Sequence, residues 1–594
     1  MPGLVGLITK MPRNDAEAKV LRMVAALRHE PTYSTGTWCD EALGLYIGWA
    51  ERDTSICTGM PIESEHRELS LFMSGEVMTE AGELPAKGSH LIAKAENDPC
   101  FPKRLNGLFH GLLADRRNHR AILFNDRYGM HRLYYRDGGD AFYFAAEAKA
   151  ILEVCPETRS IDADGMAEYL SCGCTLEYRT MFRDVSILPA GSAWIFKAGT
   201  LNLKGQYFNP EEWENQTPLD SETYYRELMQ VFSTRVPPYF QTDNPVGIAL
   251  TGGLDSRMLM SWSGAAPTSL RCFSFGSSIR ESQDVKIARL VSKVCDQPHQ
   301  TITVGDEFLQ SFAHYAERTV YLTDGCVEVK HAPDLYVSEL ASKIAPLRVT
   351  GNYGGEVLRH VPTFKPLELP HGLFASSLNR HLAHAKETYT NSLAGHPLSF
   401  AVFRQAPWRQ YGLLALERTQ QTIRSPFLDN GIVQTVFRAP KSSLDNNEVS
   451  LHLIADGSRA LSAIRTDRGS GGQLPWFGAA LQQRFLDFTF KAEYAFDYGM
   501  PNSIAPLDHA LKSLHLERMF LGRHKFTHFR VWYRDALSNY VREMLLDTRS
   551  LARPYLERGA VERIVREHCT GRRNHTTAIH KLLSLELIHR LFID

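Results

Sequence analysis

The chain has 594 residues, a net charge of −1, 43% hydrophobic residues and 22% charged residues. This length is sufficient for two to four domains with a large core. The near-neutral balance gives no reason to expect nucleic acid or an anionic membrane as a partner. No apolar run approaches the ~18 residues of a membrane-spanning helix, and the N-terminus lacks the basic start and long apolar core of a signal peptide. We therefore expect a multidomain cytoplasmic protein.

Cysteine usage agrees with that location. The ten cysteines are scattered along the chain and do not suggest a disulfide framework. Cys172 and Cys174 are too close together for a usual zinc pair, and no second pair lies nearby. We interpret both as packing residues.

The first 205 residues are typical of short strands joined by turns. Apolar runs occupy residues 4–9, 69–73, 105–115, 121–126 and 142–146, and Asp-Gly or Gly-Gly turns recur between runs. Long helical patterns are few. This spacing predicts stacked antiparallel sheets.

Strands and helices alternate beyond residue 215. An amphipathic helix is expected at 215–235, a strand at 246–250, a second strand at 270–276 with a helix at 283–291, and a third strand at 347–350. Alternation of this kind predicts a parallel sheet, with ligands at the carboxyl ends of its strands.

The turn after the first of these strands carries the most specific chemical pattern. In residues 251–256, Gly252 and Gly253 let the backbone approach an anion, because neither carries a Cβ. The helix that follows adds partial positive charge at its N-terminus. Thr251 and Ser256 offer hydroxyl donors, and Asp255 is able to hold Mg²⁺ against phosphate oxygens. The alternative is a glycine-rich turn without a ligand at the edge of an α/β sheet.

Four ordered motifs resemble asparagine synthetases. Residues 251–256 resemble the Ser-Gly-Gly-x-Asp-Ser loop of enzymes that split ATP into AMP and pyrophosphate, with Thr251 in the first position. Residues 107–152 resemble the glutaminase domain of class II glutamine amidotransferases, residues 424–429 match Arg-x-Pro-Phe-Leu-Asp, and residues 523–526 fall in the family's C-terminal order.

The resemblance implies a fold and a domain order. Residues 1–205 are expected to form an αββα sandwich like that of N-terminal nucleophile hydrolases. Residues 215–594 are expected to form an α/β synthetase domain with a parallel sheet and a helical C-terminal region, with an insertion at about 440–515.

The resemblance also implies ATP and Mg²⁺ as cofactors and assigns site residues. Pyrophosphate would bind Thr251, Gly252, Gly253 and Ser256, and Mg²⁺ would bind Asp255. Leu250 would pack on adenine, and the backbone of Phe273, Phe275 and Gly276 would face it, with Gly351 also at the nucleotide. Lys525 would neutralise charge in the transition state. Asp429 is either a helix cap or a functional group, and both readings stay open.

The pattern breaks at the glutaminase site. Glutamine-hydrolysing relatives carry a nucleophilic Cys after Met1, whereas this chain has Pro2, which has no thiol. The family's Asn-Gly-Glu is replaced by Ser74, Gly75 and Glu76, and the nearest candidate for its substrate-binding arginine, Arg52, is out of register. These losses predict an inactive glutaminase whose domain is kept as a structural partner.

The pattern breaks again at the turn after the third strand. A gapless match to Ser-Gly-x-Gly-x-Asp-Glu puts Gly355 at the metal-binding Asp. A shift by one residue puts Glu356 there instead, with Tyr353 placed as in β-lactam synthetases, where a Tyr helps deprotonate the attacking amine. Tyr353 and Glu356 are then catalytic, and Glu356 is a second metal ligand. Both alignments remain open.

These features together favour an AMP-forming carbon–nitrogen ligase that makes an amide or lactam without hydrolysing glutamine. Its substrate would be a small-molecule or peptide carboxylate with an amine nucleophile, as for β-lactam synthetases and lasso-peptide cyclases. Alternatives are an ammonia-dependent enzyme, a nucleotide-binding scaffold without turnover, and pyrophosphatase chemistry on sulfur or a nucleobase. The acyl acceptor is not written in the sequence, and a homodimer is left open.

Overall fold

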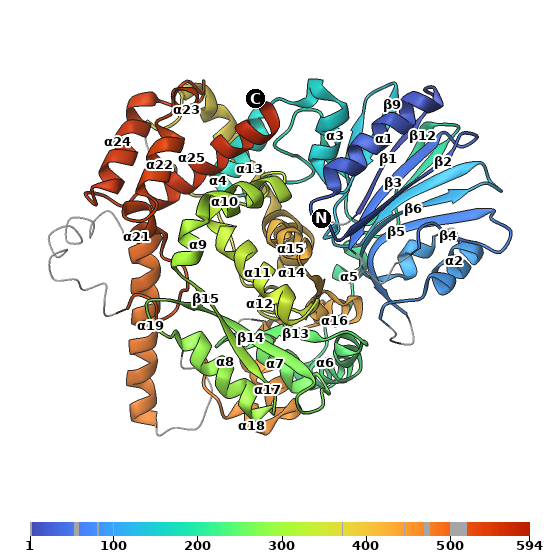
Figure 1. Cartoon of the computed structure of the whole chain (residues 1–594). Helices are drawn as coiled ribbons and strands as arrows, with labels where there is room; N and C mark the ends of the chain where they lie inside the picture. Colours follow the sequence, from blue (N-terminus) through green and yellow to red (C-terminus); the bar gives the residue numbers. More distant parts are fainter. Residues whose placement is uncertain are drawn as a thin grey trace.

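The computed structural model describes residues 3–52, 59–79, 82, 84–98, 100–370, 372–444, 446–468, 476–498 and 520–594, with the backbone alone at 476–483. Pro2 therefore lies outside the described residues. Two stacked sheets form the N-terminal part, at the right of Figure 1, and the last helices of the chain lie at the upper left.

Two six-stranded antiparallel sheets build the N-terminal part. The first has the order β10 (Ser186–Ile187), β8 (Tyr134–Asp137), β9 (Ala141–Ala145), β1 (Gly3–Thr9), β3 (Leu45–Arg52) and β2 (Tyr33–Asp40). The second has the order β12 (Thr200–Gln206), β11 (Ser192–Lys197), β7 (Arg120–Asn125), β6 (Asn106–Asp115), β5 (Leu69–Met78) and β4 (Ile62–Glu63).

Alternation along β1 shows how the layers form. Leu4 and Ile8 point between the two sheets, where they pack with Phe72 and Leu112. Val5 and Leu7 point to the opposite face, which α1 (Arg13–Leu27) and α3 (Ala148–Val154) cover. On the far side, α2 (Gly88–Asn97) packs on β4 and β5. A period of two thus places apolar residues on both faces of a strand that is buried on both. The expected αββα sandwich is confirmed.

Two local expectations fare differently. Cys172, at the end of α4 (Ala163–Cys172), and Cys174 are free and buried in one apolar cluster, so their interpretation as packing residues is confirmed. The strand expected at 69–73 does not end before Ser74. It continues to Met78, because Ser74, Gly75 and Glu76 pair with β6.

A five-stranded parallel sheet forms the centre of the second half. Its order is β15 (His299–Val304), β14 (Leu270–Ser277), β13 (Val246–Ala249), β16 (Leu347–Val349) and β17 (Thr422–Arg424). The parallel sheet and the strand expected at 347–350 are confirmed, the latter as β16, but β16 is the fourth strand of the sheet in chain order rather than the third. β15 precedes β16 in the chain, and neither β15 nor β17 was expected.

Helices surround this sheet. Those next to its strands are α6 (Ser221–Arg235), α7 (Asp255–Trp262), α8 (Gln283–Val294), α11 (Ala332–Ile344), α12 (Gly354–Arg359), α15 (Tyr411–Arg418) and α16 (Asn430–Val436). The outer ones include α10 (Phe312–Leu322), α13 (Asn379–Ser392), the π-helix η6 (Ala401–Gln410), α17 (Glu448–Gly457), α19 (Trp476–Tyr498), α21 (Phe529–Arg534), α22 (Ser538–Leu545), α24 (Arg558–Cys569) and α25 (Thr576–Ile588).

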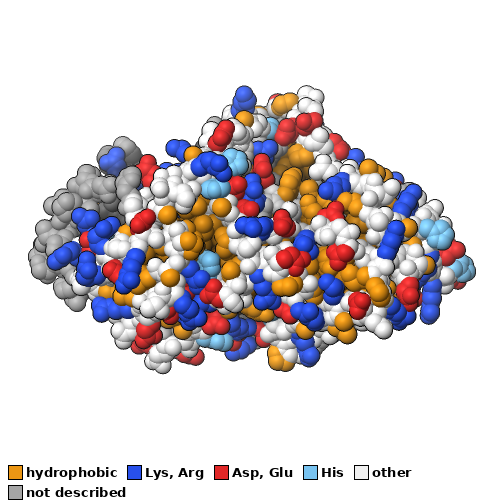
Figure 2. Space-filling view, turned by 90° about the horizontal axis from the view of Figure 1, so that it is seen from above, with side chains coloured by type: hydrophobic (Ala, Val, Ile, Leu, Met, Phe, Trp, Pro, Cys, Tyr) orange, Lys and Arg blue, Asp and Glu red, His pale blue; other side chains and the backbone are white. Residues whose placement is uncertain are grey.

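The face of the molecule seen in Figure 2 has no dominant charge. On the face shown in Figure 2, acidic and basic side chains are interspersed rather than gathered into one patch. Among the helices that the structure describes, none is long and apolar enough to cross a membrane.

Asp429 joins the two halves of the molecule. The side chain caps α16 by accepting a hydrogen bond from the Gly431 backbone N–H at 2.8 Å. Its other oxygen accepts from Asn106 Nδ2 of β6 at 2.7 Å and from the Tyr239 hydroxyl at 3.1 Å. The residue is fully buried. Of the two roles left open by the sequence, the structure favours the structural one.

Replacing Asp429 with Ala should destabilise the protein by about 2–4 kcal/mol, since it removes a helix cap and leaves buried donors unpaired. Asp429→Asn is the matched control, because Asn is also a good cap and keeps an acceptor. Urea unfolding should show the largest loss for Asp429→Ala. Equal midpoints for the two variants would contradict the capping role.

Candidate active site

A cavity of about 530 Å³ lies at the carboxyl edge of the parallel sheet. It collects residues from the loop after β13, the turn after β16 and the C-terminal end of η6. The sequence-predicted site residues that line it are Leu250, Thr251, Gly253, Asp255, Ser256, Phe275, Gly351, Tyr353 and Glu356. Gly252, Phe273, Gly276 and Lys525 are not part of the lining.

The loop 251–256 is closed by its own hydrogen bonds. The Thr251 N–H donates to Ser256 Oγ at 3.4 Å, and the Gly253 N–H donates to Thr251 Oγ1 at 3.2 Å. The Gly252 N–H donates to Asp284 Oδ1 at 2.8 Å. An anion that bound these amide N–H groups would displace their present acceptors, and one of these acceptors, Asp284, is a carboxylate.

Asp284 is a negative group beside the loop that the sequence did not single out. Burial, with the charge of Asp467 added, raises the pKa of Asp284 to about 6. A Cβ on Gly252 would lie 2.6 Å from Asp467 Cβ and 2.9 Å from Asp284 Oδ1. Glycine at position 252 is therefore required by close packing as well as by access to an anion.

The glycine-rich turn after β16 packs directly on this loop. A Cβ on Gly351 would lie 2.7 Å from the Ser256 backbone nitrogen, and a Cβ on Gly354 would lie 2.7 Å from Asp255 Cγ. Gly351 thus serves close approach between the two turns. The contact brings the starts of α7 and α12 together at the cavity.

Asp255 and Glu356 are neighbouring carboxylates in this cavity. Asp255 Oδ1 is paired with Arg359 Nη2 at 2.9 Å, and Glu356 accepts a hydrogen bond from Gln410. Burial raises the pKa of both groups, and the charge of Asp255 further raises the pKa of Glu356.

This pair fits a magnesium site of the kind that is completed by substrate. Two carboxylates held near each other would suit a divalent cation, which would share Asp255 with Arg359. Mg²⁺ commonly uses one or two carboxylates and completes its shell with phosphate oxygens and water. Within the described residues there is no group of three or more His, Cys, Asp or Glu side chains that could hold a metal by itself.

Tyr353 lies beside Glu356 in an unusual backbone conformation. It has φ +75° and precedes α12, and its side chain is buried in the apolar core at the cavity wall. A bulky residue with positive φ is uncommon and is found most often at functional sites. Burial raises the pKa of Tyr353, while the charge of Arg418 opposes the rise. The phenol therefore keeps its proton at neutral pH and is a hydrogen-bond donor.

Three predicted residues lie away from the cavity. The ring of Phe273 is fully buried, and its carbonyl accepts a hydrogen bond from the Leu250 N–H at 2.8 Å. Gly276 lies in β14 and pairs with β15. The Lys525 ammonium is paired with Asp497 and lies 4.0 Å from the centre of the Tyr498 ring.

Other lining residues were missed because no motif marks them. Arg409 and Gln410 reach the cavity from the C-terminal end of η6, and His331 is paired with Asp334 at 2.8 Å. Arg409 has no ion-pair partner in the part of the chain that the structure describes. Its charge helps to lower the pKa of the buried Glu328 carboxyl, and its side chain also lines the cavity.

Two protein-family models match the chain. A family model described as asparagine synthase matches residues 228–454 and 505–590, more than half of the chain. The chain belongs to the asparagine synthetase family. A model described as a glutamine amidotransferase domain matches residues 91–208. The residues between the two parts of the synthase match lie inside the insertion expected at 440–515.

Named relatives agree with this assignment. The chain is 21% identical to asparagine synthetase [glutamine-hydrolyzing] 1 of Bacillus subtilis over 637 residues, covering 100% of this chain and 97% of that protein. It is 24% identical to putative asparagine synthetase [glutamine-hydrolyzing] 2 of Methanocaldococcus jannaschii over 278 residues, covering 45% and 53%. Family members are ATP-dependent ligases that form amide bonds.

A solved structure of glutamine phosphoribosylpyrophosphate amidotransferase from B. subtilis, with ADP and GMP, is 12% identical. It covers 41% of this chain and 60% of that one, and its TM-score of 0.23 supports no argument.

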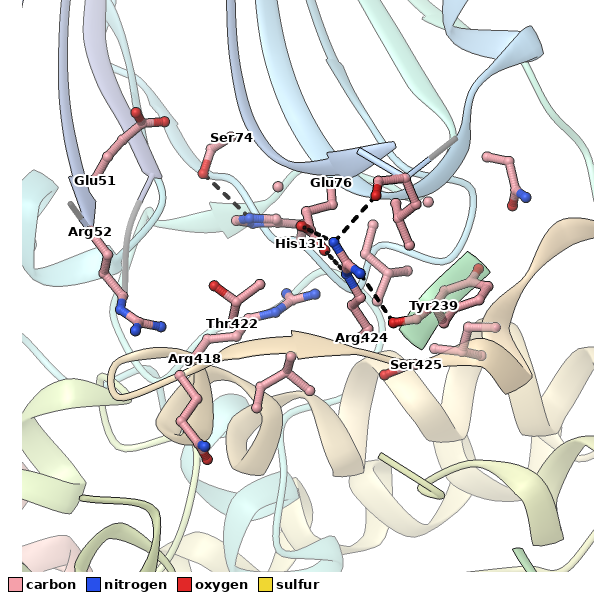
Figure 3. A pocket seen from close by; sticks show the side chains of 18 residues that line it. Glu51, Arg52, Ser74, Glu76, His131, Tyr239, Arg418, Thr422, Arg424 and Ser425 are labelled. Carbon is pink, nitrogen blue, oxygen red and sulfur yellow. Dashed lines mark hydrogen bonds and ion pairs between the residues drawn. The ribbon is translucent and has the colours of Figure 1, made fainter. Parts of the chain in front are cut away.

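This asparagine synthetase family member has a second cavity, of about 100 Å³, between its two halves. Figure 3 shows Ser74, Glu76 and Arg52 on the side of the N-terminal sheets, with Arg418 and Arg424 on the synthetase side. Arg52 thus lines this cavity, although in the sequence it is out of register with the family's substrate-binding arginine.

The Glu76 carboxylate forms an ion pair in this cavity. Arg424 forms a two-pronged ion pair with it, with Nε 2.8 Å from one carboxylate oxygen and Nη2 3.1 Å from the other (Figure 3). Arg424 also donates to the Tyr239 carbonyl at 3.1 Å. The family's glutamine-site glutamate is here a partner of the synthetase domain.

Proposed function

We propose that this protein activates a carboxylate as an acyl-adenylate, releases pyrophosphate from ATP, and joins the acyl group to an amine without hydrolysing glutamine. The observation that carries the proposal is the packing of the 251–256 loop against the 351–356 turn. It brings Asp255, Tyr353 and Glu356 to one cavity. The amine would arrive with the substrate, either in the same molecule, which gives a lactam, or as a second one.

Each side chain has a defined task in this reaction. The loop amides and Arg409 would bind the phosphates. Asp255 and Glu356 would hold Mg²⁺, which neutralises phosphate charge when bound. Tyr353, which stays protonated, would donate a hydrogen bond to the reacting carbonyl or pass a proton from the amine toward a nearby carboxylate.

The alignment with Glu356 at the metal position is supported by this geometry. Its carboxylate lies near Asp255, whereas Gly355 offers no side chain. We therefore propose the β-lactam-synthetase-like placement of Tyr353 and Glu356.

Two observations support the absence of glutamine hydrolysis. Pro2 has neither thiol nor hydroxyl to act as a nucleophile. Glu76, which would bind glutamine in a working site, is engaged by Arg424. The N-terminal domain would then act through contacts rather than chemistry.

Incubation with glutamine, ATP and Mg²⁺ should release no glutamate above a blank without enzyme. Pro2→Cys should also stay inactive, because a thiol alone leaves Glu76 paired and Ser74 in place of the family's Asn. A glutamate assay on both proteins checks this. Steady glutamate release by the parent would refute it.

The ligase function itself is tested by pyrophosphate release with a panel of carboxylates that carry amines. Substrate-dependent release with AMP formation and an amide product is expected. Release only with ammonium and an amino acid would favour the ammonia-dependent alternative. ATP binding without release across the panel would favour a nucleotide-binding scaffold.

A further inference from the structure

A third cavity, with its own set of lining residues, lies where the N-terminal domain meets α13 and η6. It has a volume of about 540 Å³. We call it the arginine cleft, defined by the lining residues Arg127, Arg132, Arg404, Phe208, Phe403 and Trp408.

The cleft concentrates positive charge. Arg127 donates to the carbonyls of Leu105 and Lys103, and Arg404 Nη1 donates to the Ser392 carbonyl at 2.7 Å. Arg132 is buried behind the cleft wall, where it donates to the Pro407 carbonyl and stacks on Tyr411, with its guanidinium carbon 3.8 Å from the ring centre. These acceptors are neutral.

Within the residues that the structure describes, none of the three guanidiniums is paired with a carboxylate, and the lining includes one acidic side chain, that of Glu177. The cleft therefore has an excess of positive charge that a bound anion would balance. Guanidinium groups suit carboxylate and sulfonate ligands because of their planar, two-pronged geometry.

Its walls are flat and aromatic. Tyr128 and Phe403 are stacked, with ring centres 5.6 Å apart and planes 13° from parallel. Trp408 and Tyr178 also line the cleft, and Tyr178 is half exposed. Apolar rings beside cations bind ligands that combine a flat hydrophobic part with an acidic group.

The cleft shares a wall with the cavity of about 530 Å³ at the carboxyl edge of the parallel sheet, which we call the nucleotide cavity. Arg404, Pro407 and Trp408 of η6 face the cleft, whereas the next residues, Arg409 and Gln410, line the nucleotide cavity. Gln410 donates to Glu356. π-Helical segments are rare and occur frequently at functional sites. Movement of η6 on ligand binding would thus reach the carboxylate assigned to the metal.

We propose that the arginine cleft binds a small organic anion with a flat aromatic part, and that its occupancy stabilises η6 and, through Gln410, the position of Glu356. Binding itself does not depend on the proposed ligase function. Only the consequence for Glu356 rests on it.

Binding is measured with 8-anilinonaphthalene-1-sulfonate, an aromatic sulfonate whose fluorescence rises in apolar sites. The full chain should bind it saturably. 2-Naphthoate should displace it, and the uncharged 2-naphthamide should displace it at least about 10-fold less well, as expected for a lost charge-assisted contact. Equal displacement by the two competitors would refute an anion site.

Variants then locate the site. Arg404→Gln keeps a donor for Ser392 but loses the charge, and should weaken binding by about 10-fold. Trp408→Leu should weaken it too. Arg380→Gln, at an exposed arginine of α13, is the matched control and should bind as the parent does. The exposed aromatic face of α19, where Phe488 is 62% exposed, is the competing location. Loss of binding in Phe488→Ser but not in Arg404→Gln would overturn the proposal.

The link to the nucleotide cavity is measured by amide hydrogen exchange without turnover. 2-Naphthoate at about its parental Kd should slow exchange in residues 401–410 and 354–359 of the parent, and should slow both much less in Arg404→Gln at the same concentration. Slower exchange in 401–410 alone would confine the effect to the cleft and refute the coupling. Thermal unfolding of each variant excludes a general loss of fold.

Discussion

Asp255→Asn should lower pyrophosphate release by about 10²-fold or more, because a metal-binding carboxylate contributes several kcal/mol to phosphoryl-charge stabilisation. The change keeps the size of the side chain, and the amide oxygen still accepts from Arg359. Asp255 is only partly buried, and the substitution adds no volume beside Gly354, so the variant should fold normally. The measurement is pyrophosphate release over a Mg²⁺ titration.

Asp456→Asn is a suitable control, since Asp456 lies on α17 and accepts from the Tyr225 hydroxyl at 2.6 Å, outside the cavity lining. It should release pyrophosphate at the parental rate. If Asp255→Asn is as fast as its control at every Mg²⁺ concentration, the 251–256 loop is not the site of ATP cleavage.

Tyr353→Phe and Glu356→Gln should fail at different steps. Tyr353→Phe removes the phenolic hydroxyl, which should leave adenylation intact and slow amide formation by about 10²–10⁴-fold, the range for a lost acid–base group. Glu356→Gln should weaken adenylation itself, because it removes charge at the metal. Tyr353→Phe retains the buried ring, so the strained turn should persist.

Rapid-quench experiments separate the two steps. Tyr353→Phe should give a burst of pyrophosphate without matching amide product, and Glu356→Gln should give no burst. Gln410→Leu provides a control for Glu356, because it removes the neutral partner but keeps the charge, and should be affected less. Parental product formation in Tyr353→Phe and Glu356→Gln alike would eliminate the proposed placement of both residues.

The sequence was informative where hydrophobic periodicity and a motif coincide. β13 and β14 were expected within one or two residues, because an apolar run ends in a glycine turn or precedes an amphipathic helix. β15 was missed because its exposed positions are polar and its buried ones few. β17 has only three residues, too short for any periodicity, and pairing with β16 alone defines it.

Site prediction had a similar limit. The motifs predicted that Asp255 and Glu356 belong to the nucleotide site, and both line the cavity. Arg359, Asp284 and Gln410 contact the motif residues. Their positions depend on how the helices pack, which no local sequence pattern predicts. Lys525 shows the reverse case, since a matching motif did not guarantee a place in the cavity lining.

The contacts of Glu76 and Asn106 have an evolutionary consequence. Arg424 and Asp429 are buried in the synthetase domain, and their partners Glu76 and Asn106 belong to the other domain. Deleting that domain would remove these two partners and open the Arg424 guanidinium and the Asp429 carboxylate to water in their place. A lineage that loses glutaminase chemistry can therefore discard the nucleophile in one substitution, whereas loss of the gene segment would also remove part of the packing of the synthetase domain. Compensating changes at 424 and 429 would open the way to a shorter protein.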